Sequence, residues 1–111
     1  MMASAPVQIE VYSPSDKHLC FVFVQVPDNQ FLDLATKYPP EGFAGQNIKL
    51  NEAIKEGITQ KETEGIARHL KIPHDTKLKF EVFRGIPEAV DHAMPPFDMN
   101  GKKFWILPQQ S

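Results

Sequence analysis

An eight-residue run at positions 19–26 constrains the fold of this chain more than any other stretch. It reads Leu-Cys-Phe-Val-Phe-Val-Gln-Val, and its β-branched and aromatic side chains favour a pleated strand over a helix. Successive side chains of a strand point to opposite faces, and here both alternating sets are apolar apart from Gln25. Pro27 ends the run because a proline has no N–H to donate to a sheet ladder. We therefore expect 19–26 to be the central strand of a sheet, covered on both faces.

Two further segments show strand-like alternation, and a turn signal predicts a hairpin. Residues 7–12 and 77–83 each place apolar side chains on one face and polar ones on the other. Near the C-terminus we expect a hairpin over about 97–107, because Asn100-Gly101 supplies the positive φ angles of a type I′ turn. Strands that follow one another in sequence usually lie side by side, so these segments predict a sheet of four to five mostly antiparallel strands.

Helical periodicity follows the central strand. Phe31, Leu34, Ala35 and Tyr38 are spaced as i, i+3, i+4 and i+7, which is the spacing of one apolar helix stripe. We expect a helix over 28–38 whose stripe packs across one face of the central strand.

A second helix is indicated by the capping box Thr59-x-x-Glu62, in which the hydroxyl accepts a backbone N–H of the first helical turn. This helix should end before Pro73, and a short helical turn is expected at 52–56. Strands and helices do not alternate as βαβ units. The order therefore predicts an α+β fold in which two to three helices pack on the sheet.

Length and composition predict one domain. The chain has 111 residues, of which 41% are hydrophobic and 23% charged, enough for one hydrophobic core. We expect a flexible leader over 1–5, a single α+β domain over 6–108 and a flexible tail over 109–111. The single cysteine, Cys20, cannot form an internal disulfide, and no apolar run is long enough to span a membrane. These features predict a cytoplasmic protein.

Residues 66–76 read Ile-Ala-Arg-His-Leu-Lys-Ile-Pro-His-Asp-Thr and resemble the first helix and turn of bacterial helix-turn-helix regulators. Thr76 then stands where the recognition helix often opens, although Lys71 replaces the usual turn glycine and Lys77 an apolar residue. The resemblance implies DNA binding centred on residues 66–84. The side chains that would contact DNA are Arg68, His74, Lys77, Lys79 and Arg84. Against this alternative, the alternation noted above favours a strand, and a net charge of −2 provides no basic excess.

Catalytic and metal-binding patterns are not found in the sequence. The four histidines are His18, His69, His74 and His92. They form no H-E-x-x-H arrangement, and a zinc site needs three or four ligands. No P-loop, G-x-S-x-G or dinucleotide-binding glycine pattern occurs. We therefore expect no catalytic residue, metal or cofactor. A small enzyme whose polar groups converge only in the folded chain is a second alternative, because catalytic triads are recognised by geometry.

Aromatic side chains near the C-terminus and around the loop 39–45 indicate a binding surface. A terminal hairpin is commonly a sheet edge, and exposed aromatic residues are enriched at the centres of interfaces. The candidate partner-binding residues are Tyr38, Phe43, Phe97, Phe104 and Trp105. The alternative is that Trp105 fills the domain's own core. We expect a non-catalytic protein that binds another protein, as an inhibitor, adaptor or accessory subunit would, or that forms a homodimer through the same edge.

Overall fold

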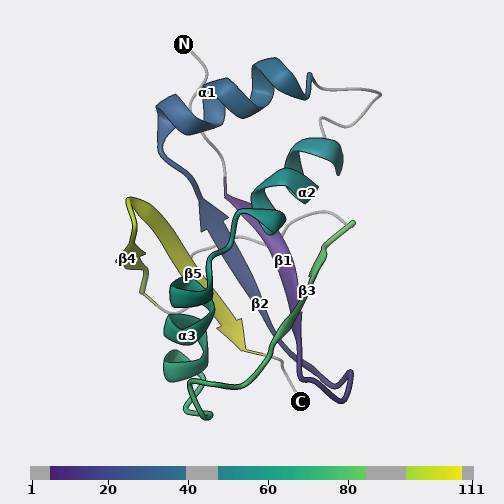
Figure 1. Ribbon diagram of the computed structural model, residues 1–111, viewed down its shortest axis with the longest axis vertical. Helices are drawn as coiled ribbons and strands as arrows, with labels where there is room; N and C mark the ends of the chain where they lie inside the picture. The colour runs from purple at the N-terminus through teal and green to yellow at the C-terminus, as the bar shows by residue number, and fades with distance from the viewer. Residues whose placement is uncertain (1–5, 40–47, 85–94, 109–111) are drawn as a thin grey trace.

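The structure, a computed structural model, describes residues 6–39, 48–84 and 95–108 (Figure 1). The elements follow in the order β1 (Val7–Tyr12), β2 (His18–Gln25), α1 (Asp28–Lys37), α2 (Ile48–Glu56), α3 (Gln60–His69), β3 (Lys79–Val82), β4 (Phe97–Met99) and β5 (Lys102–Pro108). They form one five-stranded antiparallel sheet and three helices, which confirms the predicted α+β fold. The predicted leader and tail lie outside the described residues. Within the described ranges, no helix is long and apolar enough to cross a membrane.

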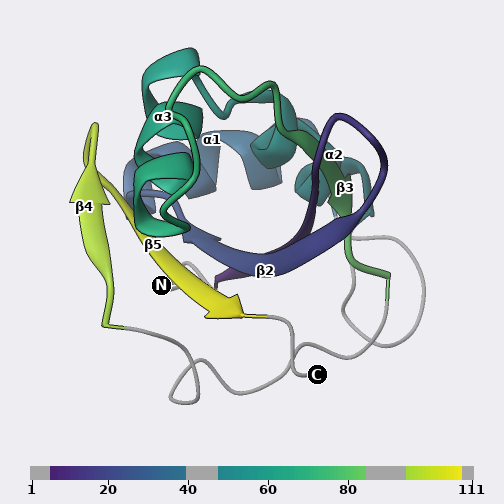
Figure 2. The same ribbon diagram turned by 90° about the horizontal axis from the view of Figure 1, so that it is seen from below.

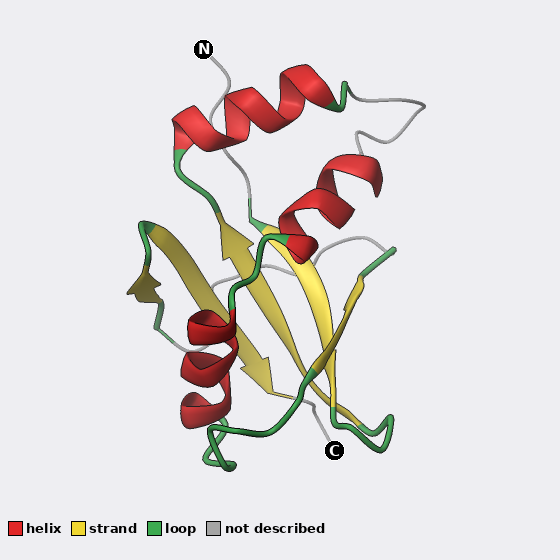
Figure 3. Ribbon diagram, in the orientation of Figure 1, coloured by secondary structure: helices red, strands yellow, loops and turns green. Residues whose placement is uncertain are grey.

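The strand order is β3-β1-β2-β5-β4, so β2 is the central strand, as predicted (Figure 3). It pairs with β1 on one side and with β5 on the other, and Phe23 lies directly opposite Trp105. The predicted C-terminal hairpin is also confirmed, because β4 and β5 pair across a turn in which Asn100 and Gly101 have φ angles of 56° and 79°. β5 thus lies inside the sheet, and β4 and β3 form its edges.

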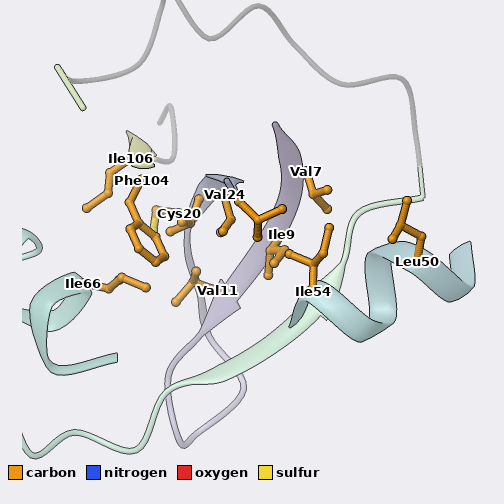
Figure 4. Close-up of a cluster of buried hydrophobic side chains, with 12 residues drawn as sticks. Val7, Ile9, Val11, Cys20, Val24, Leu50, Ile54, Ile66, Phe104 and Ile106 are labelled. Carbon is orange, nitrogen blue, oxygen red and sulfur yellow. The ribbon is translucent and has the colours of Figure 1, made fainter. Parts of the chain in front are cut away.

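All three helices lie on one side of the sheet (Figure 2). Every second residue of the three middle strands faces them and is buried, because alternation sends one set of side chains into the helix layer. In this core Ile66 of α3 lies near Phe104, and Ile54 of α2 lies near Ile9 (Figure 4). The two helices therefore cover the sheet face that holds the core.

Helix α1 does not pack across the central strand. It lies beyond the end of β2 and beside α2 (Figure 1), and none of its residues is fully buried. Its predicted stripe, from Phe31 to Tyr38, packs half-buried against the margin of the core. The predicted position of this helix was wrong because α2 and α3 occupy the sheet face and α1 starts within three residues of the strand end.

Candidate functional site

The segment that the DNA-binding hypothesis needs as a recognition helix is instead a strand. Residues Lys79–Val82 form β3, which pairs antiparallel with β1, with Phe80 opposite Val11 and Val82 opposite Ile9. Phe80 and Val82 pack toward the helices while Lys79 and Glu81 are exposed, so burial follows a period of two. A recognition helix needs side chains that repeat with a period of 3.6 residues, and the helix itself must enter the major groove. Residues 76–84 therefore do not form the recognition helix that a helix-turn-helix motif requires.

The five residues named for that hypothesis are exposed but do not form one surface element. Arg68 lies near the end of α3, and His74 and Lys77 lie in the connection to β3. Lys79 is in an ion pair with Asp16, with Nζ and Oδ1 2.7 Å apart, and Arg84 approaches Glu52 at 3.7 Å. Two of the five side chains, Lys79 and Arg84, are thus held next to carboxylates.

The residues named for partner binding are distributed over separate parts of the fold. Phe104 is fully buried in the core, so its side chain cannot contact a partner. Phe97 is half-buried in a ring stack, 3.8 Å from His69 and 5.4 Å from Phe104 between ring centroids. Tyr38 is half-buried at the end of α1, and Trp105 is half-buried on the sheet face away from the helices. Phe43 lies outside the described residues.

A buried ion pair joins the start of α3 to the β4–β5 turn. Glu62 and Lys102 are both buried, and Nζ of Lys102 donates to Oε1 of Glu62 at 3.0 Å and to the carbonyl of Gly57 at 2.9 Å. Oε2 of Glu62 accepts hydrogen bonds from Asn100 at 2.8 Å and from the Thr59 hydroxyl at 3.0 Å. Thr59 is the helix N-cap that the sequence predicted. Both carboxylate oxygens of Glu62 accept hydrogen bonds. The cluster therefore has the geometry of a structural clamp between α3 and the β4–β5 turn.

Two opposing effects act on the pKa of Glu62. Burial raises the pKa of the carboxyl. Hydrogen bonds from Asn100, Lys102 and Thr59, together with the positive charge of Lys102, lower the pKa by more than burial raises it, so the pKa is lowered overall. Glu62 is therefore a charged, structural carboxylate at neutral pH. The sequence contained one signal for this cluster, since Lys102 shares the alternation of the buried Phe104 and Ile106.

Groups with catalytic potential are not brought together in the described part of the chain. The thiol of Cys20 is buried, and burial raises its pKa to about 12, so it is a poor nucleophile. No group of three or more His, Cys, Asp or Glu side chains could hold a metal there. A hollow of about 330 Å³ lies between α2, the end of α1 and Arg84, and its lining contains neither His69 nor His74. The hollow brings together Tyr38 and Arg84, which the sequence had assigned to different functions.

The sheet face that points away from the helices carries aromatic and apolar side chains on neighbouring strands, and we call it the outer face. Its members, by strand alternation and ring contact, are Tyr12, His18, Phe21, Phe23, Phe83, Trp105 and Leu107. Neighbouring rings meet edge to face, with centroids 5.2 Å apart for Tyr12 and His18, 4.8 Å for His18 and Phe21, and 5.1 Å for Phe21 and Phe83.

Burial differs across the outer face. Phe23 and Leu107 are buried, whereas Phe21, Phe83 and Trp105 are half-buried. No described helix lies on this side of the sheet (Figure 2).

Comparison of the chain with protein-family models, with curated proteins and with solved structures finds no match.

Proposed function

We propose that this chain is a small non-catalytic binding protein that acts through a protein–protein surface, as an inhibitor, adaptor or accessory subunit does. The observation that carries the proposal is the outer face, where half-buried aromatic rings line a sheet surface that no described helix covers. Sheets bury apolar faces against a second layer, and aromatic residues dominate the energetics of interfaces. Phe21, Phe83 and Trp105 are the proposed anchors.

The state of the reactive groups supports binding over catalysis. The Cys20 thiol is buried among apolar side chains, and the Glu62 carboxylate is saturated with donors. His69 uses Nδ1 to contact the Gly65 carbonyl at 2.9 Å and its ring to stack on Phe97. Each of these groups thus has a structural role. We also propose that the protein works in the cytoplasm, where a lone thiol stays reduced.

Affinity capture with matched variants tests the proposal. The wild-type chain and the variants Phe83→Ser, Trp105→Ala and Leu32→Ser are immobilised and exposed to an extract of the source cell. Leu32 is the control because it is 56% exposed on α1, away from the outer face. We expect one protein to be retained stoichiometrically by wild type and by Leu32→Ser and to be lost by the other two.

Circular dichroism of each variant shows whether the fold is intact, and sedimentation of the chain alone shows whether the partner is a second copy. The proposal is wrong if folded Phe83→Ser and Trp105→Ala retain the same proteins as wild type, or if wild type retains none and stays monomeric.

A further inference from the structure

Two carboxylates lie directly opposite each other on the outer face. Glu10 of β1 and Glu81 of β3 are paired in the antiparallel register, and both side chains point away from the helices. Directly opposed side chains have Cβ atoms about 4.5–5.5 Å apart, and like charges at such positions destabilise a sheet. Glu81 is exposed and Glu10 half-buried. The fold therefore tolerates a repulsive pair on the surface assigned above to a partner.

Nearby cations are engaged with other carboxylates. Lys79 is paired with Asp16, and Lys55 with Glu52 at 2.9 Å, although the charge of Glu81 also contributes to the raised pKa of Lys55. The Tyr12 hydroxyl donates to Oε2 of Glu10. The pKa of Tyr12 is raised by that hydrogen bond, by burial and by the charges of both glutamates. The negative charges of Glu10 and Glu81 therefore act on the Tyr12 hydroxyl.

Aromatic rings frame the two carboxylates. Phe21 stands directly opposite Glu10 on β2, and its ring contacts Phe83, which follows Glu81 by two residues. Carboxylates next to aromatic faces are the combination that recognises cationic side chains, through charge-assisted hydrogen bonds and cation–π attraction. A guanidinium suits this surface best because it is planar, weakly hydrated and able to bond two carboxylates at once.

We propose that the β1–β3 half of the outer face binds a lysine- or arginine-bearing segment of the partner protein, with the cation held by Glu10 and Glu81 and its stem against Phe21. The inference rests on the proposed function and specifies the chemistry of the partner. Charge complementarity decides this choice, since a neutral or acidic segment would leave the glutamate pair repulsive.

The test uses the peptide acetyl-Gly-Arg-Gly-Arg-Gly-amide as the probe and the same peptide with Gln in place of Arg as the neutral comparison. Amide NMR shifts of the full chain are followed during titration. We expect the arginine peptide to shift the signals of Glu10, Tyr12, Phe21 and Glu81, and the neutral peptide to bind at least about fivefold more weakly.

Two variants provide the matched comparison. Glu81→Gln should weaken arginine-peptide binding by about fivefold, while Asp98→Asn, which removes one charge from the same face at β4, should change it by less than about twofold. Equal losses in both variants would show a non-specific charge effect and overturn the inference, as would unchanged binding by Glu81→Gln.

Stability supplies an independent readout. Glu81→Gln removes the like-charge opposition and should raise the urea midpoint, whereas Asp98→Asn removes a carboxylate opposite Lys103 and should not raise it. A lowered midpoint for Glu81→Gln overturns the argument from repulsion.

If capture by the outer face succeeds while the arginine peptide fails to bind, this inference fails and the proposed function stands. If capture fails and the chain stays monomeric, the proposed function fails by itself.

Discussion

Lys102 and Glu62 are opposite charges buried where α3 meets the β4–β5 turn. Replacing Lys102 by Met would leave the Glu62 carboxylate buried without its cation, and removing one member of a buried pair costs about 3–5 kcal/mol. We expect Lys102→Met to lower the free energy of unfolding by that amount in urea titrations. Lys103→Met, the exposed neighbour, is the control and should change it by less than about 0.5 kcal/mol. Similar effects at both positions would contradict the clamp.

The same pair predicts how stability depends on pH. The folded-state pKa of Glu62 is lowered, so folding favours its charged form, and this contribution is complete above the unfolded-state pKa of about 4.3. It is lost as the pH falls through the folded-state pKa. Wild type should therefore lose more unfolding free energy between about pH 5 and pH 3 than Glu62→Gln does, as measured by urea titrations at each pH. Parallel curves would refute the assignment.

At the level of single residues, the sequence predicted what lies within one helical turn and missed what lies across the fold. Thr59 caps α3 as its spacing to Glu62 indicates, and Asn100-Gly101 forms the expected turn. The same Glu62 also binds Lys102 from 40 residues away. Capping rules consider only residues within the first helical turn and cannot predict such a distant partner. The capping box therefore explained only part of what this carboxylate does.

The contact between α3 and β4 depends on Gly65. A Cβ built at this position would lie 2.2 Å from Cε of Met99 and 3.3 Å from its Sδ. Alanine gains roughly 0.5–1 kcal/mol of helix propensity, but overpacking costs roughly 1–3 kcal/mol. Because the displaced atom ends a flexible side chain, we expect Gly65→Ala to destabilise the protein by roughly 1 kcal/mol.

A double-mutant cycle checks this explanation. In a Met99→Ala background the obstruction is gone, so Gly65→Ala should stabilise the protein by roughly 0.5–1 kcal/mol. The sign of the effect should thus reverse between the two backgrounds in thermal or urea unfolding. An identical effect in both would mean that Met99 does not limit the position.

At the level of elements, hydrophobic period together with the turn and capping signals identified the strands and two of the helices, but not the surfaces against which they pack. Alternation at 77–83 correctly favoured a strand over a recognition helix, because Phe80 and Val82 face the core. The stripe of α1 was recognised but placed wrongly, since periodicity says which side of a helix is apolar and not which neighbour covers it. Helix α2 begins at Ile48, before the short turn expected at 52–56.

For the whole molecule, the two apolar faces of β2 have different surroundings. The set that includes Val22 and Val24 lies under the helices, whereas Phe21 and Phe23 belong to the outer face. The sequence predicted two covered faces from the two apolar sets of alternating side chains in 19–26, and it could not predict that all three described helices share one side. That asymmetry separates a core-forming face from the proposed binding face.

Helix α1 should be the least stable described helix. Its stripe is only half-buried and it contains no fully buried residue, whereas Val22 and Val24 of β2 are completely buried. Elements with little buried apolar surface open locally, without unfolding of the whole domain. In native-state hydrogen exchange we expect α1 amides to open with a free energy lower than that of β2 amides by about 1.4 kcal/mol or more, which is a tenfold difference in the opening equilibrium. The α3 amides, whose helix is held by the Glu62–Lys102 pair, are the internal comparison and should exchange more slowly than those of α1. Equal protection of α1 and β2 would mean that the domain opens only as a unit and that α1 is integral to its core.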